Sequence, residues 1–152
     1  MSNDIDAHEA FQIALNYCNY RERSQREVED KLLSKKISKN IILSCIKKLK
    51  ELNVINNIRF SQSFARGKNR NNRWGRNKIK YHLIAKGLNS EEVEFGLNCI
   101  EEEDYINSIK TSIEIYLKLN KKKDRNKLIN HLISKGYEIQ IINITLSGVD
   151  SN

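Results

Sequence analysis

The sequence predicts an all-α protein, made of three tandem three-helix repeats that form an elongated, curved helical array. The first observation behind this prediction is a unit of about fifty residues that occurs three times. Its core reads V-E-D-K-L-L-S-K-K-I, then I-K-Y-H-L-I-A-K-G-L, then L-I-N-H-L-I-S-K-G-Y, and Leu32, Leu83 and Leu132 coincide in the overlay. The second is the absence of proline, which suits helices joined by short links better than strands and turns. Such an array favours an extended binding surface over an enclosed catalytic cavity.

The first repeat is expected to span residues 1–55. Apolar residues at helical spacing from Phe11 to Cys18 predict its first helix. Ser24 then opens the second helix, because Glu27 three residues later completes a capping box. Ser38 is expected to cap the third helix, which presents a broad apolar face.

The second repeat is expected at residues 56–102, with its first helix starting near Asn56. Residues 69–72, N-R-N-N, have weak helix propensity and are predicted to link this helix to the next. The second helix should run from about Trp74 to Lys86 and end at Gly87, which suits a left-handed cap. Another helix should begin at Ser90.

The third repeat is expected at residues 103–152, with Asp124 as the N-cap of its second helix. The isoleucines between residues 138 and 146 partly alternate, a pattern that taken alone favours a strand. The register of the repeat favours a helix there, and a helix is the prediction. We expect the tail from Ser147 onward to be frayed.

Composition excludes several classes of protein. The chain is 39% hydrophobic and 30% charged, and it has no apolar run of the ~20 residues that a membrane-spanning helix needs. Its polar start lacks the layout of a signal peptide, so a cytoplasmic location without a membrane is expected. Cys18, Cys45 and Cys99 are single and widely spaced, which predicts reduced, mostly buried thiols.

No catalytic or metal-binding pattern stands out. His82 and His131 occupy one position of the repeat, where the first copy has Lys31, so they are interpreted as surface residues and not as metal ligands. Consecutive carboxylates at residues 101–104 point in different directions on a helix and are interpreted as a solvated helix end. Phosphate-binding and nucleophile motifs are lacking. We therefore predict a protein that is not an enzyme and needs no metal or cofactor.

The positive charge is concentrated in one part of the chain. The formal net charge is +8, and no acidic residue occurs between Glu51 and Glu91. The only tryptophan, Trp74, lies among the cations of this interval; it stacks on a base or anchors an interface, or else it simply packs at a helix start. Basic residues also recur in the link before each second helix, which predicts a surface for a polyanion or an acidic protein. The candidate contact surface consists of Arg21, Arg23, Arg59, Arg66, Lys68, Arg70, Arg73, Trp74, Arg76, Lys78, Lys80, Lys121, Lys122 and Lys123.

With these residues identified, the chain resembles the RecX regulatory family from about residue 10 onward. The resemblance rests on A-L-N-Y-C (14–18), R-E-R-S-Q-R-E-V-E-D-K-L (21–32), L-K-E-L-N-V-I-N-N-I-R-F-S-Q-S-F-A-R (49–66) and W-G-R-N-K-I-K-Y-H-L-I-A-K-G-L (74–88). Two features depart from the family pattern. Asn56 and Asn57 stand where two aspartates are usual, which predicts weaker capping at the repeat junction, and His82 stands where glutamate is common.

The resemblance implies a non-catalytic regulator of recombination and DNA repair, and a monomer is expected although the sequence leaves the oligomeric state open. Its expected partner is the RecA recombinase filament, whose ATP hydrolysis and strand exchange such proteins typically suppress, and direct contact with single-stranded or double-stranded DNA is possible. Three alternatives stay open. The chain could be a DNA-binding module that acts without RecA, or an adaptor for another acidic protein. Binding to anionic lipid is the weakest alternative, because the basic segment at residues 66–80 has few apolar residues to insert.

Overall fold

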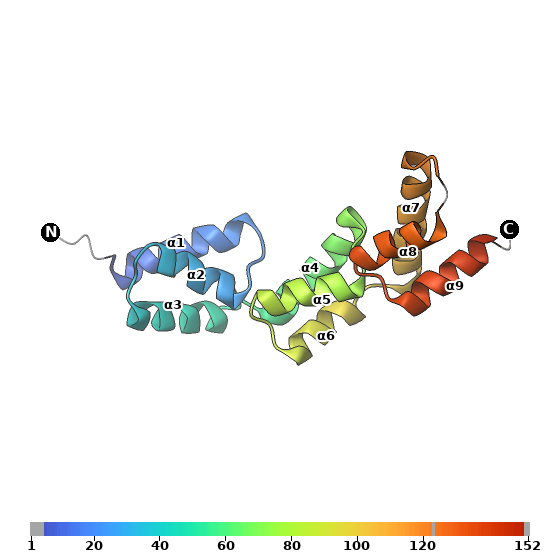
Figure 1. The fold of residues 1–152 in the computed structure, drawn as a ribbon. Coiled ribbons are helices and arrows are strands. Elements are labelled where there is room, and N and C mark those ends of the chain that lie inside the picture. The colour runs from blue at the N-terminus through green and yellow to red at the C-terminus, as the bar shows by residue number, and fades with distance from the viewer. Residues whose placement is uncertain (1–4, 123, 151–152) are drawn as a thin grey trace.

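The computed structural model describes residues 5–122 and 124–150 of the chain. These residues form nine α-helices and no strand, and Figure 1 shows them as three successive groups of three along an elongated molecule. The predicted all-α array of three-helix repeats is confirmed. The helices are α1 (Ala7–Tyr20), α2 (Gln25–Ser34), α3 (Lys39–Glu51), α4 (Asn57–Asn72), α5 (Arg76–Ala85), α6 (Ser90–Asn98), α7 (Glu102–Leu119), α8 (Arg125–Ser134) and α9 (Ile139–Asp150).

Local sequence signals explain where most of these helices begin and end. Ser24 and Glu27 form both hydrogen bonds of the predicted capping box at α2. The Asp124 carboxylate accepts hydrogen bonds from the first turn of α8, as predicted. Asn56 also caps its helix, since its side chain accepts from the Arg59 N–H at 2.9 Å despite the departure from aspartate. Ser38 stands at the N-cap of α3 without a side-chain cap bond.

The structure corrects two sequence-based boundaries. Residues 69–72 do not link two helices: they form the last turn of α4, and α5 begins at Arg76 and not at Trp74. The Asn69 side chain explains the longer α4, because its amide donates to the Trp74 carbonyl at 3.0 Å and to Ser108 Oγ at 2.9 Å. At the other end, α9 is helical as predicted, but it continues past Ser147 to Asp150 where a frayed tail was expected.

The apolar core is divided into two separate clusters. The first lies within the first repeat (α1–α3) and includes Val28, Leu32 and Leu49. The second is continuous through the second repeat (α4–α6) and the third repeat (α7–α9), from Phe60 to Leu146. Repeats two and three therefore share one hydrophobic core, whereas the first repeat has its own.

Polar contacts join the first repeat to the second. Arg59 Nε lies 2.6 Å from a Glu22 carboxylate oxygen, and Lys86 Nζ lies 3.1 Å from Glu27. The backbone at the start of α2 adds a hydrogen bond from the Gln25 N–H to the Asn57 side chain at 2.9 Å. Because the two cores do not merge, these ion pairs and hydrogen bonds are the main connection besides the chain itself.

The same docking contact occurs at both junctions. The start of α2 lies on the turn after α5, where Ser24 Oγ donates to the Lys86 carbonyl at 3.0 Å. One repeat further on, the start of α5 lies on the turn after α8, where the Gly75 N–H donates to the Lys135 carbonyl at 2.8 Å. Glycine follows each of these lysines because the backbone is left-handed there, with φ 89° at Gly87 and 97° at Gly136. A Cβ would in addition meet the Arg26 side chain at Gly87, and Lys78 of the docked helix at Gly136.

Candidate functional site

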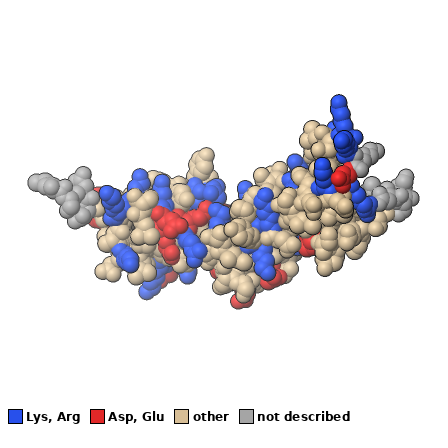
Figure 2. Space-filling model, viewed as in Figure 1, with Lys and Arg blue, Asp and Glu red and all other residues tan. Residues whose placement is uncertain are grey.

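The structure divides the predicted contact residues into those that hold the fold together and those that face outward. Figure 2 shows basic side chains over all three repeats, including the middle of the molecule, with acidic ones gathered over the first repeat and along the edge below. Lys80, Lys121 and Lys122 are exposed, and Lys123 lies outside the described residues. Arg21 is half exposed and lies 3.3 Å from Glu27.

Arg23 and Arg59 are structural. Arg23 is only 8% exposed, its Nε donates to the Tyr17 carbonyl at 3.0 Å, and its guanidinium lies 3.7 Å from the centre of the Tyr17 ring. Arg59 pairs with Glu22 and also donates to the Asn53 and Val54 carbonyls at 3.0 Å each. Both guanidinium groups are therefore committed within the protein.

Arg76 joins the second and third repeats. It pairs with Glu102 at 2.9 Å and with Glu138 at 3.0 Å, and its guanidinium lies over the Tyr105 ring at 3.8 Å. The Tyr105 hydroxyl in turn donates to Glu138, and burial followed by this hydrogen bond raises the pKa of that tyrosine. The network is partly buried, and losing Arg76 would leave Glu138 and the Tyr105 ring without their partner, so Arg76 is a poor candidate for contact with another protein.

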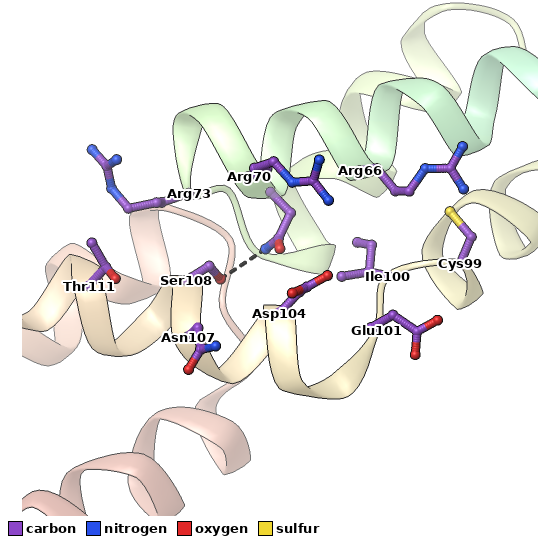
Figure 3. Close-up of a pocket in the computed structure, with 11 residues that line it drawn as sticks. Arg66, Arg70, Arg73, Cys99, Ile100, Glu101, Asp104, Asn107, Ser108 and Thr111 are labelled. Carbon is purple, nitrogen blue, oxygen red and sulfur yellow. Dashed lines mark hydrogen bonds between the residues drawn. The ribbon is translucent and has the colours of Figure 1, made fainter.

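A groove between α4 and α7 collects three of the remaining arginines. Arg66, Arg70 and Arg73 line one wall of a cavity of about 380 Å³, which we call the arginine groove (Figure 3). Arg66 and Arg70 are four residues apart and so share one face of α4, and Arg73 follows at the C-cap of the helix. Within the described residues, none of the three lies within ion-pair distance of a carboxylate.

The end of α4 is fixed by the third repeat, and this positions Arg73. Arg73 is the C-cap residue of α4 and has left-handed backbone geometry, with φ 54°. Its carbonyl accepts a hydrogen bond from the buried Tyr137 hydroxyl at 2.9 Å, and that hydroxyl also contacts Ser108 Oγ at 3.0 Å. The groove is therefore framed by the shared core of repeats two and three.

Sequence reasoning missed the opposite wall of the groove. Glu101, Asp104, Asn107, Ser108 and Thr111 line it from the start of α7, and Cys99 and Ile100 close one end. The acidic residues had been interpreted only as a solvated helix end. The spacing of these residues was the available signal: Glu101, Asp104, Ser108 and Thr111 recur every three or four residues, as residues on one face of a helix do.

The other flank of α4 carries a cluster of aromatic rings and lysines, which we call the aromatic–lysine face. Trp74 packs edge-on to Phe64 at 6.4 Å and lies 4.5 Å from the His82 ring, centre to centre. Lys68 and Lys78 place their Nζ atoms 4.9 Å and 4.6 Å from the Trp74 ring centre. Such cation–π contacts hold positive charge over the indole.

The two histidines interpreted as surface residues are half-buried and stacked on aromatic rings. His82 lies against Trp74, and His131 lies 4.9 Å from the Tyr116 ring. Burial and then the neighbouring lysines hold the pKa of His82 below its ordinary value, and burial does the same for His131. Over the described ranges, no group of three or more His, Cys, Asp or Glu side chains could hold a metal ion.

The cysteines are free, but only Cys45 is fully buried, whereas Cys18 and Cys99 are half-buried. Burial raises the pKa of each thiol above its ordinary value, which favours the protonated form.

Among the helices in the described part of the chain, none has the length and apolar character needed to cross a membrane.

Comparison with known proteins identifies relatives over nearly the whole chain. Residues 10–49 match the family model described as "RecX, first three-helix domain", and residues 56–97 match "RecX, second three-helix domain". Proteins named "Regulatory protein RecX" are 27% identical in Prosthecochloris aestuarii, with 99% of each chain covered, and 30% identical in Finegoldia magna, with 88% of this chain and 68% of the relative covered.

Some relatives are longer than this chain. The protein from Clostridium tetani is 36% identical, and the match covers 82% of this chain but 59% of the relative. With the protein from Enterococcus faecalis the chain spans about half of the relative's length, 53%. Among solved structures, the crystal structure of RecX from Lactobacillus salivarius superposes with a TM-score of 0.83 at 27% identity, covering 96% of this chain and 97% of the other.

Proposed function

The chain belongs to the RecX family, and from this premise we propose that it binds the RecA recombinase filament formed on single-stranded DNA. The proposed effect is suppression of ATP hydrolysis and strand exchange, and so regulation of recombination and DNA repair in the cytoplasm by a monomer. An elongated array of three repeats supports this proposal, since it can contact several subunits of a filament at once.

The observation that carries the proposal is the arginine groove. Arg66, Arg70 and Arg73 line the groove from α4 and its C-cap, while the other arginines of this region are engaged in the repeat junctions. Guanidinium groups without an internal ion pair are suited to carboxylates of a partner, because each can form two parallel charge-assisted hydrogen bonds. We propose these three residues as the main contact with RecA.

A titration into RecA, ATP and single-stranded DNA tests the function. The wild-type protein should lower ATP turnover as its concentration rises. The triple variant Arg66→Glu, Arg70→Glu and Arg73→Glu should lose this effect while keeping its helix content by circular dichroism. Arg76 is left intact, because its removal would break the junction with Glu102 and Glu138.

The matched control reverses the same number of charges elsewhere. Lys39, Lys47 and Lys50 are exposed on α3, and their change to Glu removes the same net charge away from the groove. The control should retain most of the suppression. Full suppression by the groove variant would contradict the site, and a wild-type protein without effect on ATP turnover would contradict the function.

The aromatic–lysine face favours a second candidate function, direct binding of single-stranded DNA. Trp74 offers a ring on which a base can stack, and Lys68 and Lys78 beside it can contact phosphates. Titration with an oligonucleotide should quench the fluorescence of Trp74, the only tryptophan. Changing both lysines to Ala should lower the slope of log affinity against log salt by about 1.4, the value for two contacts with a single strand.

The control for this second test again lies on α3. Changing Lys47 and Lys50 to Ala removes the same charge far from the tryptophan and should leave the salt slope unchanged. An affinity that falls equally in both double variants would indicate a diffuse electrostatic effect, and this candidate would then be rejected.

A further inference from the structure

The two walls of the arginine groove have opposite charge. Arg66, Arg70 and Arg73 line the α4 side, whereas Glu101 and Asp104 line the α7 side. Figure 3 shows Asp104 rising from α7 toward the wall that carries Arg70. Among the described residues these carboxylates and arginines form no ion pair within 4.0 Å, so the two walls face each other across open space.

A nucleic-acid strand is a poor match for this arrangement. Its phosphates would be attracted by the arginines but repelled by Glu101 and Asp104 on the opposite wall. No aromatic side chain lines the groove on which a base could stack, in contrast to the aromatic–lysine face on the other flank of α4. A uniformly acidic peptide meets the same repulsion as a phosphate chain.

A protein segment with charges of both signs fits both walls. Its carboxylate can pair with the arginines, while its lysine or arginine side chain lies against Asp104 or Glu101. Its backbone N–H and C=O groups find partners in the side chains of Asn107 and Thr111 between the charged ends. Electrostatic complementarity of this kind fixes the orientation of the bound segment as well as its identity.

We propose that the arginine groove binds a mixed-charge segment of a partner protein and not a nucleic-acid strand. The inference rests on the proposed function, in which the segment belongs to the protein subunits of the RecA filament. It assigns protein contact to the α4–α7 groove, and it assigns a binding role to Asp104, which a purely cationic surface would not use.

A charge reversal at Asp104 separates the two kinds of occupant by the sign of its effect. If a polyanion occupies the groove, Asp104→Lys adds attraction and tightens binding. If a mixed-charge segment occupies it, the same change removes an ion pair and creates repulsion, so affinity for the RecA filament should fall roughly tenfold. Affinity is measured by fluorescence anisotropy of the labelled full-length protein on filaments preassembled with a non-hydrolysable nucleotide.

Glu103→Lys is the matched control. Glu103 precedes Asp104 in the first turn of α7, is also exposed, and does not line the groove. Both variants make the same change in net charge and place a lysine near the same helix N-terminus, so effects on the helix dipole are shared. Circular dichroism checks that both keep the wild-type helix content, and the expected tenfold loss is confined to Asp104→Lys.

A second arm uses a single-stranded oligonucleotide without RecA. Here the two variants should gain affinity equally, through net charge alone. The inference is overturned if Asp104→Lys binds the filament as tightly as Glu103→Lys or more tightly, or if Asp104→Lys binds the oligonucleotide more tightly than Glu103→Lys. A wild-type protein that does not bind the filament overturns the proposed function together with the inference, and this failure is visible before any variant is compared.

Discussion

Gly75 lies directly against Gly136, backbone to backbone, at the junction of the second and third repeats. The Gly75 N–H donates to the Lys135 carbonyl at 2.8 Å, and the Asn77 N–H donates to the Gly136 carbonyl at 2.9 Å. A Cβ on Gly75 would lie 2.3 Å from the carbonyl carbon of Gly136, a distance that no side chain can occupy. The start of α5 can therefore dock on the turn after α8 only because the residue at this position is glycine.

The change Gly75→Ala should separate the two repeats and lower the free energy of unfolding by about 1–3 kcal/mol, the usual cost of overpacking. The backbone of Gly75 is extended, so the loss would come from the collision and not from strain in φ. Gly67→Ala is the control, because a Cβ at Gly67 has no atom within 4 Å and should gain about 0.5–1 kcal/mol in a helix interior. Urea unfolding followed by circular dichroism measures both, and equal stability of the two variants would contradict the close contact.

The division of the core into two clusters predicts two unfolding units. Leu32, Leu83 and Leu132 occupy the same position of the repeat, and each is fully buried. Leu32→Ala should cost about 2–5 kcal/mol in the first repeat alone, so that circular dichroism shows an early transition while Trp74 fluorescence does not. Leu83→Ala should shift the fluorescence transition as well, because Leu83 lies in the shared core. Coincident transitions in the Leu32 variant would show that the two clusters unfold together.

Local signals explain why so much of the fold could be predicted from the sequence. The capping box at Ser24 and the glycines after α5 and α8 act within a few residues, and repetition of the unit strengthens each signal. The end of α4 depends on contacts distant in sequence. Asn69 has weak helix propensity, but Ser108 from the next repeat accepts its amide hydrogen bond, and this tertiary contact overrides the local preference.

The candidate site was predicted less completely, for the same physical reason. Charge density identified the basic stretch, but the role of each arginine depends on an acid elsewhere in the chain. Arg76 pairs with Glu138, which is 62 residues away. The acidic wall of the groove became apparent only when α7 was placed beside α4, because facing walls are a property of packing and not of one helix.

The stacking of Arg23 on Tyr17 predicts a structural role for one of the arginines first assigned to the contact surface. Arg23→Ala should lower the free energy of unfolding of the first repeat by about 2–3 kcal/mol, since it removes a largely desolvated cation–π contact and a charged hydrogen bond. Arg70→Ala removes an exposed cation and should change the free energy of unfolding by less than about 0.5 kcal/mol. Denaturant midpoints test both variants. Binding to RecA should be weakened more by Arg70→Ala than by Arg23→Ala, the reverse of the order for stability. An Arg23 variant as stable as the wild type would return this residue to the list of candidate contacts.

The junction between the first two repeats should weaken in acid because of Glu27. Burial raises the pKa of this carboxyl, but hydrogen bonds from the Ser24 N–H and Lys86, together with the charges of Lys86 and Arg21, outweigh it and leave the pKa below its ordinary value of 4.5. The ionised form therefore adds stability that is fully present above about pH 4.5 and is lost as the pH falls through the lower folded-state value. Glu27→Gln keeps a capping side chain but no charge, so it should be less stable than the wild type at pH 7.

The difference between wild type and Glu27→Gln should shrink as the pH falls from 4.5 through the lower folded-state pKa of Glu27, below which the wild-type carboxyl is protonated and resembles the amide. Asp30→Asn on the same helix is the control, because it removes the same charge from an exposed position and should cost little stability at pH 7. Urea midpoints measured by circular dichroism between pH 3 and pH 7 follow this difference. The midpoint of the transition in which the first repeat unfolds should change most. A constant difference across this range would mean that the Glu27 charge does not stabilise the junction, and that the backbone contacts of Ser24 and Gln25 hold the first repeat in place.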